Sequence, residues 1–153
     1  MLVVTNSARS TASLGKAFAS FLKKKDVVLL EGDLGGGKTT FIKGVLKGLG
    51  YRGRVLSPSF TLLRQYNAKD TLVHHVDLYR LEEADLFSFG LEDYLSVAEG
   101  FTLIEWGERL ERFIPQYIKI KFLFKGQTKR NIYFSLKGYA AKRDKFLKEV
   151  LET

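Results

Sequence analysis

The sequence predicts an α/β fold in which helices cover both faces of a mixed central sheet, making three layers. One observation is the order at 27–49, where an apolar run, a glycine-rich loop and a segment of helical periodicity follow one another. A second is a pair of extended segments at 60–66 and 71–77, separated by a short polar linker, which predicts an antiparallel hairpin. A similar pair at 117–124 and 131–136 is the third. Hairpins beside a strand–loop–helix unit predict a sheet with both parallel and antiparallel pairs.

The composition favours one domain over residues 1–153, because 45% hydrophobic content can bury a sizeable core. The chain has no cysteine, which excludes a disulfide framework and a thiolate metal site. Met1–Arg9 lacks the basic-then-apolar pattern of a signal peptide, and no apolar run approaches the ~20 residues of a membrane span. We therefore expect a cytoplasmic protein with no membrane contact.

The net charge of +8 is unevenly distributed along the chain. Residues 1–76 carry 12 Lys and Arg against 4 Asp and Glu, residues 77–111 carry 2 against 10, and residues 116–153 carry 10 against 3. The basic flanks suit contact with nucleic acid or with an acidic protein surface. Charge alone does not distinguish these partners from lysine side chains that only face water.

The first half of the chain alternates predicted strands and helices. Met1–Thr5 predicts a short strand, and an apolar stripe after a Ser- and Thr-rich stretch predicts a helix over Ser10–Lys24. Val27–Glu31 is mostly apolar and predicts a buried strand. Thr39–Leu49 has helical spacing and is followed by Gly50, which predicts its end.

Gly32–Thr39 reads Gly-Asp-Leu-Gly-Gly-Gly-Lys-Thr and fits the phosphate-binding loop template G-x-x-x-x-G-K-[ST] at every fixed position. Glycines let consecutive backbone N–H groups face one anion, and the following helix adds its positive dipole end. Lys38 is predicted to reach the β- and γ-phosphates, and the Thr39 hydroxyl to ligate Mg²⁺. The sequence therefore predicts a nucleoside triphosphate site on a P-loop NTPase-like fold.

Two acidic residues end predicted strands. Asp77 closes the strand at 71–77, and Glu105 follows the apolar run Phe101–Ile104 in the manner of a Walker B motif. At the carboxyl edge of the sheet, both carboxylates would lie near Mg²⁺ or its water. Adjacent His74 and His75 point to opposite faces of a strand and cannot together bind a metal, so they are expected to have hydrogen-bonding or structural roles.

The stretch Ser57–Thr61 offers three hydroxyls around Pro58. It is either a switch that senses the γ-phosphate or Mg²⁺, or an ordinary Ser-Pro turn. Further along, short helices are predicted at 81–89 and 107–113, a further turn at 91–95, and a basic terminal helix at 139–151. The hairpin at 117–136 is predicted to have one buried and one basic face.

Four motifs occur in an order that is similar to one family. They are Gly-Asp-Leu-Gly-Gly-Gly-Lys-Thr-Thr at 32–40, Ser-Pro-Ser-Phe-Thr-Leu at 57–62, His-Val-Asp-Leu-Tyr-Arg at 75–80 and Ile-Glu-Trp at 104–106. Together they resemble the TsaE family, formerly YjeE, which are bacterial ATPases of the threonylcarbamoyl modification of adenosine in tRNA. The phosphate loop alone is shared by many families, whereas the combination is far more specific.

The resemblance implies a catalytic and binding role for several residues. Lys38, Asp77 and Glu105 would be catalytic, with Thr39 and Glu105 holding Mg²⁺ and Asp77 supporting Mg²⁺ or the attacking water. It also implies that Lys129 or Arg130 approaches the nucleotide. The implied ATP-binding residues are Ser7 and Thr11 near the adenine, Gly35, Gly36, Gly37, Lys38, Thr39 and Thr40 around the phosphates, and Glu108 close to the nucleotide.

The resemblance further implies two protein partners, TsaD and TsaB, which form a complex. Hydrolysis of ATP by this chain would reset that complex between turnovers. Contact with tRNA is then expected to be indirect. We expect weak ATPase activity for the chain alone, because no residue is an obvious arginine finger, whose absence lowers rates by ~10³–10⁵. Two alternatives share the phosphate loop: a small-molecule or nucleoside kinase, which needs an acceptor pocket and usually a basic lid, and a nucleotide-sensing module without hydrolysis.

Overall fold

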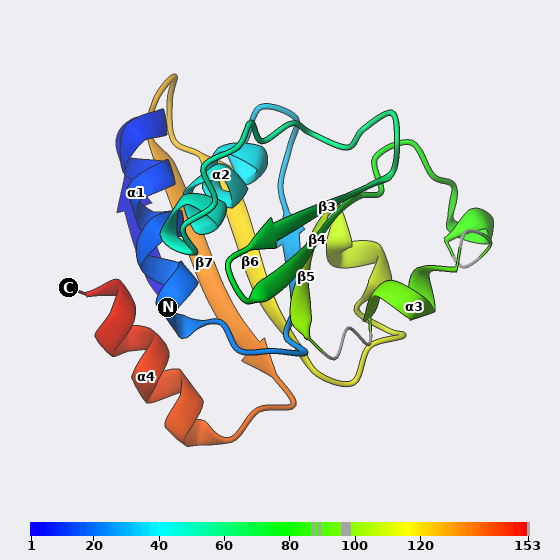
Figure 1. Cartoon of the computed structure of the whole chain (residues 1–153). Coiled ribbons are helices and arrows are strands. Elements are labelled where there is room, and N and C mark those ends of the chain that lie inside the picture. The colour runs from blue at the N-terminus through cyan, green and yellow to red at the C-terminus, as the bar shows by residue number, and fades with distance from the viewer. Residues whose placement is uncertain (87, 89, 96–98, 153) are drawn as a thin grey trace.

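A mixed seven-stranded sheet forms the middle layer of the molecule (Figure 1). The computed structural model describes residues 1–86, 88, 90–95 and 99–152. The central strand β2 pairs in parallel with β5 and β6, and β4 is parallel to β5, while the remaining pairs are antiparallel. Across the sheet the strands are β1 (Leu2–Thr5), β7 (Arg130–Lys137), β6 (Tyr117–Phe124), β2 (Val27–Glu31), β5 (Gly100–Glu105), β4 (Thr71–Asp77) and β3 (Leu63–Ala68).

Helices lie on both faces of this sheet, which confirms the predicted three layers. Helices α1 (Ala8–Phe18) and α2 (Lys38–Gly48) lie side by side over one face, with α4 (Ala141–Leu151) beside α1 (Figure 1). The other face carries shorter elements. They are the 3₁₀ turn η2 (Glu83–Asp85), helix α3 (Leu91–Leu95) and the 3₁₀ turn η3 (Gly107–Leu110).

Strand β2 separates the two halves of the hydrophobic core. Val28 and Leu30 belong to the cluster under α1 and α2, whereas Val27 and Leu29 belong to the cluster on the opposite face. All four side chains are buried. Because both faces of the strand are covered, its sequence is continuously apolar and does not alternate.

Helices α1 and α2 pack backbone against backbone through glycines. Gly15 on α1 lies against the carbonyl of Phe41, and Gly44 on α2 lies against the carbonyl of Ala12. A Cβ at either glycine would overlap the facing carbonyl oxygen. Side chains are therefore excluded from the closest part of this helix pair, and the two helix axes approach more closely than side chains would permit.

Asp26, just before β2, anchors the C-terminal helix. Its carboxylate accepts hydrogen bonds from the Tyr139 hydroxyl at 3.1 Å and the Lys23 backbone N–H at 2.8 Å, and it pairs with Arg143 on α4. Burial, together with the negative charge of Asp26, raises the pKa of the Tyr139 hydroxyl. This buried polar cluster ties the C-terminal helix to the strand at the centre of the sheet.

Strands at 27–31, 71–77 and 117–124 have their predicted bounds, and both hairpins are confirmed. The predicted helix at Ser10–Lys24 was too long. Helix α1 ends at Phe18 and continues as the 3₁₀ turn η1 (Ala19–Phe21). Its extension is blocked because Lys25 has a positive φ of 72° and the Lys23 N–H is bound by Asp26.

The strand predicted at 60–66 begins later, at Leu63. The backbone N–H groups of Thr61 and Leu62 both donate to the carbonyl of Pro58, and Leu62 has a positive φ of 63°. This turn uses the donors that a strand would offer to its neighbour. A tight proline turn therefore replaces the first part of the predicted strand.

Three predicted helices are shorter in the structure. Within 81–89 the helical residues are Glu83–Asp85, and residues 87 and 89 of that prediction lie outside the described part. The helix predicted at 107–113 ends at Leu110, and the terminal helix begins at Ala141. The helix at Leu91–Leu95 agrees with the further turn predicted there.

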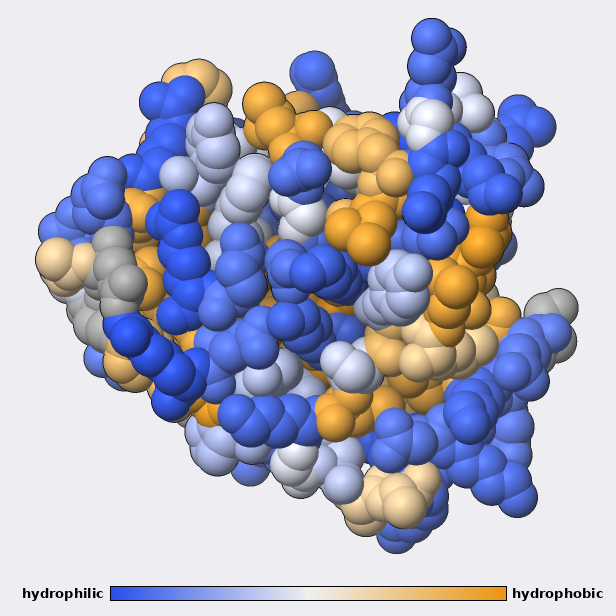
Figure 2. Space-filling model, turned by 180° about the vertical axis from the view of Figure 1, so that it is seen from behind, coloured by the Kyte–Doolittle hydropathy of each residue, from blue (hydrophilic) through white to orange (hydrophobic). Residues whose placement is uncertain are grey.

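The surface mixes charged groups with isolated apolar ones. Figure 2 shows a face that is largely hydrophilic, with hydrophobic residues in several separate patches. The two most exposed large apolar side chains described are Phe60, at 83%, and Leu34, at 71%. Leu34 belongs to the glycine-rich loop after β2, and Phe60 lies in the turn that follows Pro58.

Among the residues that the structure describes, no helix is both long enough and apolar enough to cross a membrane.

Replacing Gly44 by alanine should destabilise the protein, because the new methyl group would overlap the Ala12 carbonyl. We expect a loss of about 1–3 kcal/mol in the free energy of unfolding, as for other overpacked sites. Urea unfolding measures this change. The same substitution in an open helix gains roughly 1 kcal/mol from helix propensity. A more stable Gly44→Ala protein would therefore contradict the close approach of the two helices.

Candidate active site

The loop between β2 and α2 has a backbone that only glycine adopts readily. Gly32, Gly35 and Gly37 have φ angles of 139°, 75° and 106°. At Gly32 there is also no space for a side chain, because a Cβ would lie 2.6 Å from the carbonyl oxygen of Phe122 on β6. Gly37 is the N-cap residue of α2, so the loop leads directly into the positive end of the helix.

Lys38 is the first residue of α2 and is only 4% exposed. Its Nζ donates hydrogen bonds to the carbonyl oxygens of Gly32 at 2.5 Å and Asp33 at 3.0 Å, and it lies 4.1 Å from the centroid of the Trp106 ring. Burial lowers the pKa of Lys38, although the carboxylates of Glu105 and Glu108 oppose the shift. The ammonium group is therefore held over the loop by neutral partners, the two carbonyls and the indole ring, and no acidic side chain forms an ion pair with it in the described residues.

Glu105 ends β5 and lies at the centre of a small hydrogen-bonded group. Its Oε1 accepts a hydrogen bond from the Thr39 hydroxyl at 2.8 Å and lies 2.8 Å from Nε2 of His75. Glu105 and His75 are both buried. One carboxylate oxygen is thus fixed by partners from α2 and β4.

Asp77 ends β4 and is the direct partner of Glu105 across the parallel pair. Its Oδ2 accepts hydrogen bonds from the hydroxyls of Ser59 at 2.5 Å and Ser57 at 3.3 Å, and its Oδ1 accepts one from the Tyr79 N–H at 2.9 Å. The Ser-Pro stretch therefore forms a turn and also reaches the site. Whether it acts as a switch remains a prediction.

Two adjoining hollows surround the glycine loop. One of about 170 Å³ is lined by Lys38, Thr39, Ser57, Ser59, Asp77 and Glu105, together with loop glycines. The other, of about 200 Å³, is lined by Ser7 and Thr11 of the α1 N-terminus and by Gln127, Thr128 and Arg130. The residues Gly35, Gly37 and Thr40 line both hollows. All the predicted phosphate and adenine residues thus line one or both of these adjoining hollows.

Of the two late basic residues, Arg130 contacts the glycine loop. Its Nε donates to the Gly36 carbonyl at 3.2 Å, and its guanidinium lies 4.2 Å from the centroid of the Phe124 ring. Lys129 is exposed. The β6–β7 hairpin therefore brings one cation to the side of the loop on which Ser7 and Thr11 lie.

Glu108 lines neither hollow, but its carboxylate is close enough to interact electrostatically with Lys38. Burial raises the pKa of the Glu108 carboxyl, and the negative charge of Glu31 adds to this effect. Its buried Oε2 has no hydrogen-bond partner among the described residues. Glu108 was predicted to lie close to the nucleotide, and in the structure it lies beside the glycine loop but lines neither hollow.

The donor set fits Mg²⁺ bound together with a nucleotide. Within the described residues there is no cluster of three or more His, Cys, Asp or Glu side chains that would bind a metal alone. Mg²⁺ usually takes one or two carboxylates and completes its shell with water and phosphate oxygens. Thr39, Glu105 and Asp77 offer a hydroxyl and two carboxylates at the phosphate loop, which matches that requirement.

Sequence reasoning did not place two residues in the site. His75 was expected to have a hydrogen-bonding or structural role, and the structure confirms a hydrogen bond, whose partner is Glu105. Trp106 follows Glu105 and lies under the Lys38 ammonium group, with a positive φ of 62°. The Glu-Trp dipeptide after an apolar run was the sequence signal that could have placed Trp106 in the site. No such signal existed for His75, because its contact with Glu105 depends on which strands pair.

Glu108→Gln should raise stability at neutral pH. The folded protein holds the Glu108 pKa above its unfolded value of 4.5, so the ionised carboxylate weakens the fold once the pH exceeds that value. The melting temperature of the variant should exceed that of the parent near pH 7 and 8, and the difference should vanish toward about pH 4, where the carboxyl is protonated in both states. A difference that does not change with pH would contradict the raised pKa.

Comparison with known proteins gives one consistent result. The family model described as "Threonylcarbamoyl adenosine biosynthesis protein TsaE" matches residues 5–132. The tRNA threonylcarbamoyladenosine biosynthesis protein TsaE of Bacillus subtilis is 38% identical over 135 residues, which cover 88% of this chain and 84% of that protein. The protein of the same name from Treponema pallidum is 41% identical over 118 residues, which cover 76% and 86%.

A solved structure agrees with these sequence relatives. The crystal structure of YdiB from Bacillus subtilis superposes with a TM-score of 0.80 and 33% sequence identity, and the match covers 99% of this chain and 93% of that chain. The shared architecture is consistent with the P-loop NTPase-like fold predicted from the glycine loop. With a family model that matches most of the chain, and with these relatives, the chain belongs to the TsaE family.

Proposed function

We propose that this protein is a P-loop ATPase that acts in the cytoplasm in the threonylcarbamoyl modification of adenosine in tRNA. One observation carries the proposal: Lys38, Thr39, Asp77 and Glu105 line a single hollow at the glycine loop. The names of the relatives, tRNA threonylcarbamoyladenosine biosynthesis proteins, supply the biological process. Hydrolysis requires a cation at the phosphates and a site for the attacking water, and this hollow offers groups for both.

The phosphates of ATP would bind on the glycine loop. The backbone N–H groups of the loop and of the first turn of α2 would donate to the phosphate oxygens. The Lys38 ammonium would exchange the carbonyls of Gly32 and Asp33 for the β- and γ-phosphates. In this position its charge opposes the negative charge that grows in the transition state.

Thr39 and Glu105 would hold Mg²⁺, with Asp77 beside them. Bound Mg²⁺ neutralises phosphate charge and orients the β- and γ-phosphate oxygens. His75 keeps Oε1 of Glu105 in place, so that the carboxylate needs little rearrangement on binding. Such preorganisation in a buried position strengthens each electrostatic contact.

Asp77 would orient the water that attacks the γ-phosphate. Its two oxygens are already held by Ser57, Ser59 and the Tyr79 N–H. Because these hydroxyls belong to the turn at Pro58, a change of ligand at Asp77 would alter the hydrogen bonds of that turn. This link supports the interpretation of the Ser-Pro stretch as a γ-phosphate sensor.

The partners we propose are TsaD and TsaB, and ATP hydrolysis would reset their complex. Arg130, the cation that the hairpin brings to the loop, is bound to the Gly36 carbonyl and stacked near Phe124. An arginine held in this way is not presented to the γ-phosphate side, where Asp77 and Glu105 lie. A partner protein that supplies a cation at the γ-phosphate, or moves one there, would therefore raise the rate of ATP hydrolysis.

Lys38→Met should abolish most ATP hydrolysis. The methionine retains the apolar stem over Trp106 but removes the ammonium, so we expect phosphate release to fall by at least ~10²-fold. Lys142→Met, an exposed lysine on α4, is the matched control and should keep full activity. Melting curves should show both variants folded. Undiminished phosphate release by folded Lys38→Met would refute the assigned role of Lys38.

Addition of the TsaD–TsaB pair should stimulate phosphate release from ATP by the parent protein. The stimulation should be lost with Lys38→Met, which separates it from any activity of the added proteins. The product assay must follow the γ-phosphate itself, for example with a radiolabel. Transfer of that phosphate to a metabolite in place of water would favour a kinase and exclude the proposed reaction, and a lack of turnover with the pair would favour a sensing module.

A further inference from the structure

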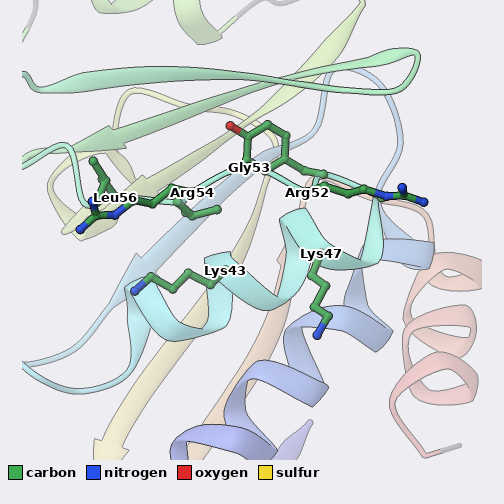
Figure 3. Close-up of a pocket in the computed structure, with 9 residues that line it drawn as sticks. Lys43, Lys47, Arg52, Gly53, Arg54 and Leu56 are labelled. Atoms are coloured by element: carbon green, nitrogen blue, oxygen red, sulfur yellow. The ribbon is translucent and has the colours of Figure 1, made fainter.

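A basic groove lies outside the candidate active site. A hollow of about 740 Å³ lies between α2 and the segment after it, and is lined by Lys43, Lys47 and residues 50–56 (Figure 3). A second hollow, of about 310 Å³, lies between α1 and α2 and is lined by Arg9, Lys16 and the same two lysines. Because both hollows share Lys43 and Lys47, we treat them together as the basic groove. Its cations are Arg9, Lys16, Lys43, Lys47, Arg52 and Arg54.

The cations of the groove have no acidic partner in the part of the chain that the structure describes. All six are exposed, and none makes a side-chain hydrogen bond or an ion pair with any described residue. No acidic residue lines either hollow. Two of the four acids in residues 1–76 are engaged elsewhere, since Asp26 pairs with Arg143 and Glu31 pairs with Lys121. The groove thus has a net positive charge that its own surroundings do not neutralise.

The spacing of these cations follows regular elements. Lys43 and Lys47 are one turn apart on α2, and Figure 3 shows them on consecutive turns, with Arg52 and Arg54 on the neighbouring segment. Like charges at this spacing repel each other and weaken a helix. A bound polyanion removes that repulsion, and it gains by releasing its own counterions.

We propose that the basic groove binds the phosphate backbone of tRNA. Protein interfaces are depleted of lysine, whereas three of these six cations are lysines, and no carboxylate lines either hollow. Lys and Arg arranged along a hollow are the usual contacts to phosphates. The choice of tRNA as the nucleic acid rests on the proposed function, and it replaces the expectation that tRNA is reached only through partner proteins.

The segment that lines the groove leads into the active site. Tyr51 packs against Tyr66 with ring centroids 5.1 Å apart, and the Tyr66 hydroxyl donates to the Leu56 carbonyl and accepts from the Leu56 N–H. Leu56 is followed directly by Ser57, whose hydroxyl reaches Asp77. The groove is therefore a distinct surface, yet its wall is fixed to the same β-hairpin that carries Asp77.

The test measures binding of a tRNA transcript by fluorescence anisotropy over a range of salt concentrations. The test variant is Lys43→Gln/Lys47→Gln/Arg52→Gln/Arg54→Gln. A control of equal net charge is Lys23→Gln/Lys142→Gln/Lys145→Gln/Lys148→Gln, whose four exposed lysines lie outside the groove. At about 0.1 M salt the test variant should bind at least roughly tenfold more weakly, and its log–log salt slope should be smaller by about 1 for each phosphate that the variant no longer neutralises. The control should bind as the parent does.

Equal binding by the test variant and the parent would overturn the inference, as would an equal weakening in the control. Binding of polyglutamate in preference to tRNA would also overturn it and would indicate an acidic protein partner.

The test variant should keep the basal ATPase rate, because none of its changed residues lines the active-site hollows. Since tRNA binding is measured without ATP, Lys38→Met should bind tRNA normally. If the parent protein bound tRNA but released no phosphate from ATP even with the TsaD–TsaB pair, the proposed ATPase activity would be refuted and the groove supported.

Discussion

Parallel pairing at the centre of the sheet determines where the chemistry of this protein can occur. Strand β5 pairs with β2 on one side and with β4 on the other, so the ends of all three strands lie at one edge. In this register Asp77 faces Glu105 directly, and the glycine loop starts where β2 ends. A shift of one residue between β4 and β5 would turn Asp77 to the opposite face of the sheet. Both faces of β2 are buried in the core, so Val27, Val28, Leu29 and Leu30 fix the position of the strand from whose end the glycine loop starts.

The site keeps several charged groups away from water, and each is held in a different way. Lys38 is bound by backbone carbonyls and an aromatic ring, Glu105 by a hydroxyl and an imidazole, and Asp77 by two serine hydroxyls and a backbone N–H. The partners of Lys38 and Asp77 are neutral groups, which orient a charge without neutralising it. Under the proposed function, the charges of Lys38 and Asp77 would remain available to a triphosphate and its Mg²⁺. Glu108 differs, since its buried oxygen lacks a partner among the described residues and its pKa is raised.

Local sequence signals predicted the strands and loops of the fold better than they predicted which side chains touch in the site. The strands at 27–31, 71–77 and 117–124 were predicted to the residue, because apolar periodicity reports burial directly. The glycine loop and both acidic strand ends were likewise visible as motifs. The late start of β3 at Leu63 was not predicted, because Leu62 adopts a left-handed conformation that its residue type disfavours. The contacts of His75 and Trp106 could not be predicted either, since they depend on which strands are neighbours. The basic groove was visible only as regional charge, because its cations come from two helices and a loop.

The glycine contact between α1 and α2 has a consequence for ligand selection. The N-terminus of α2 faces the phosphate loop, and the N-terminus of α1 brings Ser7 and Thr11 to the second hollow. With Gly15 and Gly44 holding the two backbones in direct contact, the separation of these two helix ends has little freedom to change. If ATP occupied both hollows, the distance between its phosphates and its adenine would have to match this separation. Under the proposed function, the helix pair would therefore select nucleotides by their length as well as by their chemical groups.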